Sequence, residues 1–201
     1  GWQHHTVAHL TATVNERTQL SAASSGGSMN FFHSGGGVNV VDVSDEGAYE
    51  SEGVSMYRRQ LSVIDTSDTS SYMIDVFRIN GGHVRDYSFH SRGGRFSTDG
   101  LQLSAPAPGS VASPNYDWGD DIQADGYLSG FEHMGYYYVA EPGNGYGFLG
   151  QPRRAQTDAQ WSASWSNDSA ALRLTMLPQQ GREIIVARGP LPMEGGVPYV
   201  L

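Results

Sequence analysis

The chain has 201 residues, with 12 basic and 21 acidic side chains, so its net charge is -9 at pH 7. This acidity argues against nucleic acid as a partner, because binding to phosphates needs a basic surface, although local arginines can still bind anionic sugars. The absence of cysteine excludes disulfides and thiolate metal sites. The sequence contains no run of about 18 apolar residues that would predict a membrane span. The 26 glycines and 11 tyrosines suit many short strands joined by tight turns.

Short stretches of alternating apolar residues recur along the chain and predict β-strands. In chain order these stretches are residues 5–14, 29–34, 38–44, 55–65, 71–79, 83–91, 171–177 and 182–188. Residues 45–53 are either one turn of helix or a loop. The sequence Asn80-Gly81-Gly82 predicts a hairpin that joins 71–79 to 83–91. This pattern predicts an all-β fold, a large antiparallel β-sandwich.

Residues 104–160 form a second kind of region, rich in Pro, Gly, Asn, Asp and Tyr, in which we expect one strand at 136–139. Long irregular loops in compact domains are commonly functional. We therefore expect a single sandwich domain over 1–201 that carries a loop-rich insertion at 104–160. Since the chain starts without Met and ends inside an apparent strand, we also expect it to be part of a longer protein.

The predicted strand at 83–91 is unusually polar. Alternation puts its odd-numbered residues on one face and its even-numbered residues on the other. Asp86 and His90 are then roughly 13 Å apart, whereas zinc holds its ligand atoms at about 2 Å. This strand therefore cannot bind a metal by itself. It is a half-buried structural strand, one wall of a saccharide groove, or part of a metal site that a second strand or another chain completes.

Three other groups of residues leave a structural and a functional interpretation open. The adjacent Arg58 and Arg59 point to opposite faces, so one of them could clamp a carboxylate or sulfate, or both lie on an exposed edge strand. Residues 115–126 resemble a calcium loop in composition but lack its residue order, which favours a solvated acidic loop. Several aromatic residues could be core or sugar-stacking platforms: Trp118, Tyr136, Tyr137, Tyr138, Tyr146, Trp161 and Trp165.

Four segments together resemble the C-terminal β-sandwich of heparinase II/III-like polysaccharide lyases. They are HHTVAHLTATVNERTQ (4–19), VNVVDVSDEGAYESEGVSMYRRQLSVID (38–65), YMIDVFRINGGHVRDYSFHS (72–91) and REIIVARGPLPMEGGVPYVL (182–201). They occur in the family's order with similar spacing and span nearly the whole chain. The resemblance is weakest over 104–160.

The resemblance implies a secreted or periplasmic lyase that cleaves acidic polysaccharides by β-elimination. Such enzymes neutralise a uronate carboxylate, remove its C5 proton and expel the 4-O-linked sugar. The family's proton-transferring Tyr and His lie largely on an N-terminal α/α toroid, which has no counterpart in this sequence. We therefore expect this chain to act as scaffold and cleft wall, with its helical partner domain supplying catalysis, and to be inactive when isolated.

Face geometry and the resemblance together nominate the substrate-binding residues Arg59, Arg85, Tyr87 and His90. Arg85 stands where the family has His. The family commonly holds a structural zinc, and His4 matches one of its ligands, but the ligand set in this chain is incomplete. Two alternatives stay open: a stand-alone carbohydrate-binding sandwich that uses loop 136–148, and a structural or assembly module.

Overall fold

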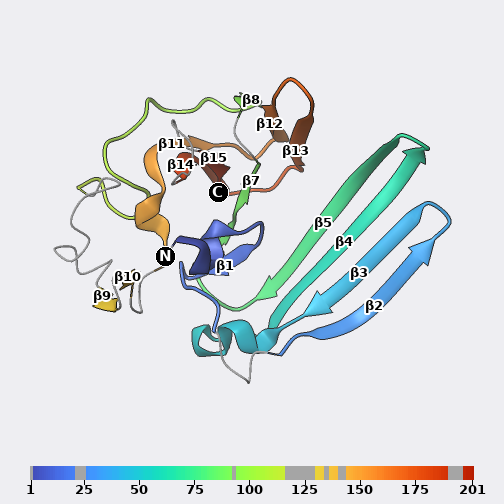
Figure 1. The fold of residues 1–201 in the computed structure, drawn as a ribbon, viewed down its shortest axis with the longest axis horizontal. Coiled ribbons are helices and arrows are strands. Elements are labelled where there is room, and N and C mark those ends of the chain that lie inside the picture. The colour runs from blue at the N-terminus through green and yellow to red at the C-terminus, as the bar shows by residue number, and fades with distance from the viewer. Residues whose placement is uncertain are drawn as a thin grey trace. The chain divides into compact units, whose positions relative to one another are not determined.

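A computed structural model describes residues 2–20, 26–91, 94–115, 130–133, 136–139, 144–189 and 197–201. The fold is all-β with antiparallel sheets in a sandwich-like arrangement, which confirms the predicted class (Figure 1). The chain divides into two compact units: unit 1 comprises Gly1–Thr18 and Asp86–Leu201, and unit 2 comprises Gln19–Arg85. In the described part of the chain, no helix is both long and apolar enough to cross a membrane.

Unit 1 contains two sheets that share one apolar core. The first has the order β11 (Gly150–Gln156), β14 (Glu183–Gly189), β15 (Val197–Val200) and β7 (Phe89–His90). The second has the order β13 (Ala171–Met176), β12 (Trp161–Ser166) and β8 (Arg95–Asp99). Buried side chains from both sheets pack together, among them Phe89, Trp165 and Ile184. Burying these large apolar groups between two layers is what stabilises a sandwich.

A second apolar cluster in unit 1 surrounds short 3-10 helices. These are η1 (Trp2–His4), η2 (Thr6–Ala8) and η5 (Tyr146–Phe148). Val7, Tyr146, Leu149 and Tyr199 are buried together there. Two small sheets of two strands each are also present: β1 (Ala12–Val14) pairs with β6 (Arg85–Tyr87), and β9 (Gly130–His133) pairs with β10 (Tyr136–Val139). The latter strand confirms the prediction at 136–139.

Unit 2 is a four-stranded antiparallel meander. Its strands are β2 (Ser28–Gly35), β3 (Val38–Ser44), β4 (Met56–Ser67) and β5 (Ser70–Asn80), in that spatial order (Figure 1). The 3-10 helix η3 (Glu46–Glu52) joins β3 to β4 and realises the helical alternative for 45–53. The Asp45 carboxylate caps it by accepting a hydrogen bond from the Ala48 N–H. Within the described residues of unit 2, no second sheet covers this one.

Most predicted strands are confirmed to within a few residues. The apolar alternation at 29–34, 38–44, 55–65 and 71–79 corresponds to β2, β3, β4 and β5, and 171–177 and 182–188 correspond to β13 and β14. The prediction at 5–14 is largely wrong, since only residues 12–14 are a strand. Backbone bonds from His5 N–H to the Trp2 carbonyl and from Ala8 N–H to the His5 carbonyl close tight turns there instead.

The predicted hairpin between 71–79 and 83–91 is also wrong. β5 pairs with β4, whereas residues 83–91 contain two short strands, β6 and β7, which pair with β1 and β15. Gly81 has a φ of 106°, and a side chain at this position would overlap the backbone of Gly53 and Val54. Gly81 therefore permits close backbone packing and is not part of a two-residue hairpin turn.

Candidate functional site

Arg59 lies on β4, and its guanidinium group already binds a carboxylate of the same sheet. Its Nε donates to Asp75 Oδ1 at 3.0 Å and its Nη2 to Asp75 Oδ2 at 2.8 Å. The guanidinium carbon also lies 4.8 Å from the centre of the Phe77 ring. A bidentate fork of this kind is the geometry with which Arg binds carboxylates. The predicted clamp for a sugar carboxylate is therefore occupied by a carboxylate of the same sheet.

Arg58 makes an equivalent pair on the opposite face, which confirms that the two arginines point apart. Its Nε and Nη2 donate to Asp42 Oδ1 and Oδ2 at 2.6 and 2.9 Å, and Asn30 Nδ2 donates to the same carboxylate at 3.3 Å. The hydrogen bond from Arg58 lowers the pKa of Asp42, and the same bond raises the pKa of Arg58. Both partners therefore stay charged near neutral pH.

Arg85, at the boundary of unit 2, is the exposed member of the predicted set. Its Nε donates to the Gly81 carbonyl at 2.9 Å and its Nη2 to the Gly82 carbonyl at 3.3 Å. These bonds fold the side chain back over the preceding turn. Since the carbonyls carry no net charge, the positive charge of Arg85 stays available to attract an anion.

Tyr87 and His90 belong to unit 1 and both lie against buried aromatic residues. Tyr87 packs on the sandwich core, with its ring centre 6.2 Å from that of Phe89. The His90 ring stacks on Tyr199, with centres 4.1 Å apart and planes inclined by 22°. Burial, with a smaller effect of His9, lowers the pKa of His90 to about 4, so its imidazole is neutral at pH 7. The four predicted substrate-binding residues thus divide equally between the two units.

His4 ends the 3-10 helix η1, and its side chain lies outside the described part of the structure. Among the described side chains, no three His, Asp or Glu residues gather as a metal would require. The described residues therefore do not form a complete zinc site, and the role of His4 stays a prediction. Most of the acidic segment at 115–126 lies outside the described residues as well.

A buried polar network in unit 1 was not evident from the sequence. The Tyr146 hydroxyl donates to Asp86 Oδ2 at 2.6 Å and accepts from Thr13 Oγ1 at 2.6 Å. Asn144 Oδ1 accepts from the Tyr146 backbone N–H at 3.1 Å. Burial raises the pKa of Asp86, and burial followed by the charge of Asp86 raises the pKa of Tyr146. Because the members lie 60 and 133 residues apart in sequence, no local pattern could reveal them.

Of the aromatic residues predicted to be either core or sugar-stacking platforms, the three whose side chains are described belong to the core. Tyr146, Trp161 and Trp165 are all buried, and the Trp165 Nε1 donates to the Pro198 carbonyl at 3.0 Å. A stacking platform needs an open ring face, which these three residues do not offer. The side chains of Trp118 and of Tyr136, Tyr137 and Tyr138 lie outside the described part of the structure.

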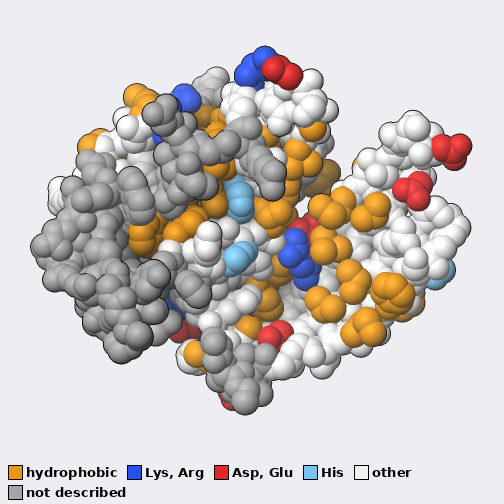
Figure 2. All heavy atoms as spheres, in the orientation of Figure 1, with side chains coloured by type: hydrophobic (Ala, Val, Ile, Leu, Met, Phe, Trp, Pro, Cys, Tyr) orange, Lys and Arg blue, Asp and Glu red, His pale blue; other side chains and the backbone are white. Residues whose placement is uncertain are grey.

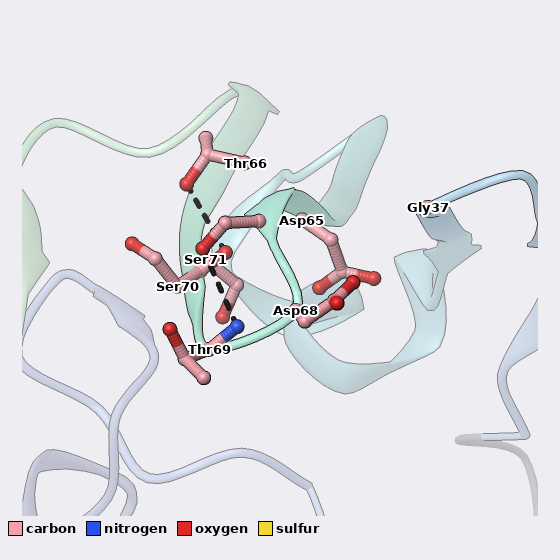
Figure 3. A pocket seen from close by; sticks show the side chains of 8 residues that line it. Gly37, Asp65, Thr66, Asp68, Thr69, Ser70 and Ser71 are labelled. Carbon is pink, nitrogen blue, oxygen red and sulfur yellow. Dashed lines mark hydrogen bonds between the residues drawn. The ribbon is translucent and has the colours of Figure 1, made fainter.

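An open hollow of about 610 Å³ lies at the tip of unit 2, where the turn between β4 and β5 meets Gly37 (Figure 3). The side chains that line the hollow belong to residues 65–71, and they carry hydroxyl groups and the carboxylates of Asp65 and Asp68. Thr66 Oγ1 donates to the Ser70 carbonyl at 3.1 Å, and the Thr69 N–H donates to Ser67 Oγ at 3.3 Å. Two carboxylates without a basic neighbour in the lining would repel an anionic sugar.

No protein-family model matches this sequence, and no curated protein sequence matches it. Any inference about function therefore rests on the motifs in the chain and on the geometry of the residues that compose them.

Proposed function

We propose that this chain is the β-sandwich portion of a heparinase II/III-like polysaccharide lyase that acts by β-elimination on uronic-acid-containing polysaccharides. The observation that supports this proposal is the pairing of its motif residues. Asp42 and Arg58 come from the VDVS and YRR motifs and bond to each other in bidentate geometry. Arg59 of YRR does the same with Asp75 of the YMIDVF motif. Residues that carry the resemblance thus fit together physically as parts of one sheet.

The same pairing favours a scaffold role over a catalytic one. Guanidinium groups that hold carboxylates of their own sheet stabilise strand register and are not free to neutralise a substrate. In this proposal the toroid domain of the lyase supplies the base and acid, and the sandwich supplies a wall of the cleft. Arg85, with its exposed charge, is the residue of this chain that attracts the uronate carboxylate. Secretion or periplasmic location, and a structural zinc that includes His4, belong to the same proposal.

The test compares the chain alone with the chain joined to an α/α toroid domain, on a panel of acidic polysaccharides. Ultraviolet absorbance of the unsaturated uronate measures cleavage, and affinity electrophoresis measures binding. We expect the chain alone to bind an acidic polysaccharide without cleaving it, and the joined protein to cleave it. Arg85→Ala should weaken binding by up to about fivefold, the effect of an exposed ion pair. Arg95→Ala, a change at an exposed arginine on β8, is the matched control.

Each outcome separates the candidate functions. Cleavage by the isolated chain would refute the scaffold role. Binding without cleavage in both forms would favour the stand-alone carbohydrate-binding module. Absence of binding and of cleavage in both forms would favour a structural or assembly module.

A further inference from the structure

One face of the four-stranded sheet in unit 2 is mostly apolar. Antiparallel register places directly opposed residues on the same face, so the face that carries Phe32 can be followed across all four strands. Its first row holds Met29, Val43, Arg59 and Phe77, the second holds Phe32, Val41, Leu61 and Asp75, and the third holds Ser34, Asn39, Val63 and Met73. We call these three rows the Phe32 face. Its apolar members are contiguous from β2 to β5.

The Phe32 face exposes large hydrophobic side chains. Met29 is 69% exposed, Phe32 63% and Met73 52%, and Val43 and Val63 are exposed as well. Figure 2 shows hydrophobic side chains gathered over the strands of this sheet. From the usual areas of such residues, these five expose roughly 500 Å² of surface. The largest apolar patch of a typical monomer covers about 300–600 Å² and is often functional, so a patch of this size is a candidate binding surface.

Charge distinguishes the two faces of the sheet. On the Phe32 face the charged side chains of the three rows are Arg59 and Asp75, which bond to each other and leave these rows without net charge. Asp65 follows Val63 on the same side of β4, is exposed, and adds a negative charge beyond the third row. The opposite face also exposes hydrophobic side chains, namely Phe31, Tyr72 and Ile74. It differs in carrying the Arg58–Asp42 pair and, beside it, the further positive charge of Arg78. The three rows of the Phe32 face can therefore meet a second copy without placing an unpaired charge between the two sheets.

We propose that the Phe32 face is a self-association surface, through which two copies of this chain pack sheet against sheet about a two-fold axis. Opposed sheets of this kind lie about 10 Å apart and interdigitate their side chains. A stable dimer buries about 800 Å² per partner. The exposed apolar residues supply more than half of that area, and Ser34, Asn39 and the partly buried members supply the rest. An apolar, internally neutralised face is complementary to itself, so a second copy is the occupant that its chemistry fits.

Sedimentation velocity of the whole chain over a range of concentrations tests the proposal. The wild-type chain should shift from monomer to dimer as its concentration rises. Phe32→Arg should weaken association by about 30-fold or more, because it places unpaired charge at the centre of the interface. Phe31→Arg is the matched control: it changes the adjacent residue on the same strand, 54% exposed, on the opposite face. This variant should associate as the wild type does.

Circular dichroism confirms that each variant is folded, and Met73→Lys on β5 provides a second test if Phe32→Arg does not fold. A wild-type chain that is monomeric at every concentration would overturn the proposal. Equal weakening by the Phe31 and Phe32 variants would also overturn it. A monomeric chain whose melting temperature falls on Phe32→Arg substitution would show that the face is covered within the chain.

Discussion

At the scale of single residues, the hydrogen bond between Tyr146 and Asp86 links η5 to β6. Tyr146→Phe removes the donor to a buried carboxylate and leaves the Thr13 hydroxyl without its acceptor. We expect the free energy of unfolding at pH 7 to fall by about 1–3 kcal/mol, the cost of leaving buried polar groups unsatisfied. The pKa of Asp86, already raised by burial, should rise further, because the hydrogen bond from Tyr146 lowers it. Urea denaturation measures the change in stability.

The control for this substitution is Tyr72→Phe, which removes the same hydroxyl from an exposed residue of β5. It should change stability by less than about 0.5 kcal/mol, as is usual for surface positions. Equal effects of the two substitutions would show that the buried network contributes nothing to stability.

His90 predicts a pH dependence of stability. Its pKa is lowered to about 4 in the folded chain from an ordinary value of 6.5, so the unfolded chain binds more protons between these pH values. The stability that neutral His90 contributes is therefore complete above pH 6.5 and is lost as the pH falls toward 4. His90→Phe keeps an aromatic ring against Tyr199 but cannot take up a proton.

Denaturant unfolding at pH 7 and pH 5 checks this prediction. The wild-type chain should lose more stability than His90→Phe between the two pH values, by an amount that corresponds to the uptake of about one additional proton on unfolding. His33→Phe, at an exposed position on β2, provides the control and should behave as the wild type does. The same pH dependence in wild type and His90→Phe would contradict the assignment.

At the scale of elements, local pattern was sufficient where strands pair with their neighbours in sequence. The strands β2 to β5 were each predicted because their apolar alternation and the turn residues between them agree, although their pairing as a meander was not. The segment WSASWS at 161–166 also alternates strictly, yet its serine content and loop-rich surroundings concealed β12. β6 and β7 could not be assigned to sheets, because their partners β1 and β15 lie far away in the sequence.

Gly81 gives an element-scale prediction, because it lets the end of β5 pack against the segment before β4. Its φ of 106° disfavours any side chain, and a Cβ there would overlap the Gly53 carbonyl oxygen. Gly81→Ala should therefore lower the free energy of unfolding by about 3 kcal/mol, since the backbone must move as well as adopt a strained angle. Thermal and denaturant unfolding measure the loss.

The matched control is Gly36→Ala in the turn between β2 and β3. Gly36 also has a positive φ, of 61°, but a Cβ there meets no atom within 4 Å. Its substitution should cost about 1 kcal/mol, the strain of the left-handed angle without a collision. A Gly81 variant no less stable than the Gly36 variant would show that close packing at Gly53 is unimportant.

At the scale of the whole molecule, the sequence predicted the fold class better than the candidate site. Alternation correctly placed Arg58 and Arg59 on opposite faces, but it could not show that Asp42 and Asp75 occupy their guanidinium groups. Those partners are set by the register between strands, which depends on the whole sheet. The stacking of His90 on Tyr199 likewise joins residues that lie far apart in the sequence. Side-chain partners of this kind need tertiary structure.

The two units should differ in local stability, because the apolar clusters around Trp165 and Tyr146 lie in unit 1, whereas the described part of unit 2 buries fewer apolar residues, among them Tyr49 and Tyr57. In hydrogen exchange, amides in the largely buried β12 should open only with global unfolding, whereas those in β2, exposed along its length, should exchange much sooner. β13 is an edge strand of unit 1 with mostly exposed residues. Comparing its exchange rates with those of β2 therefore separates the effect of an edge position from the effect of belonging to unit 2. Equal protection of β2 and β12 in dilute solution would contradict the prediction.

Hydrogen exchange measured over a range of protein concentrations also tests the proposed self-association. If two copies pack through the Phe32 face, protection of β2 through β5 should rise with protein concentration while that of β12 stays constant, because association stabilises only the segments that it covers against local opening. Phe32→Arg should abolish the rise, and Phe31→Arg should leave it intact. A concentration-dependent gain that also appears in β12 would mean that association stabilises the whole chain. A gain confined to unit 2 would locate the interface on its sheet.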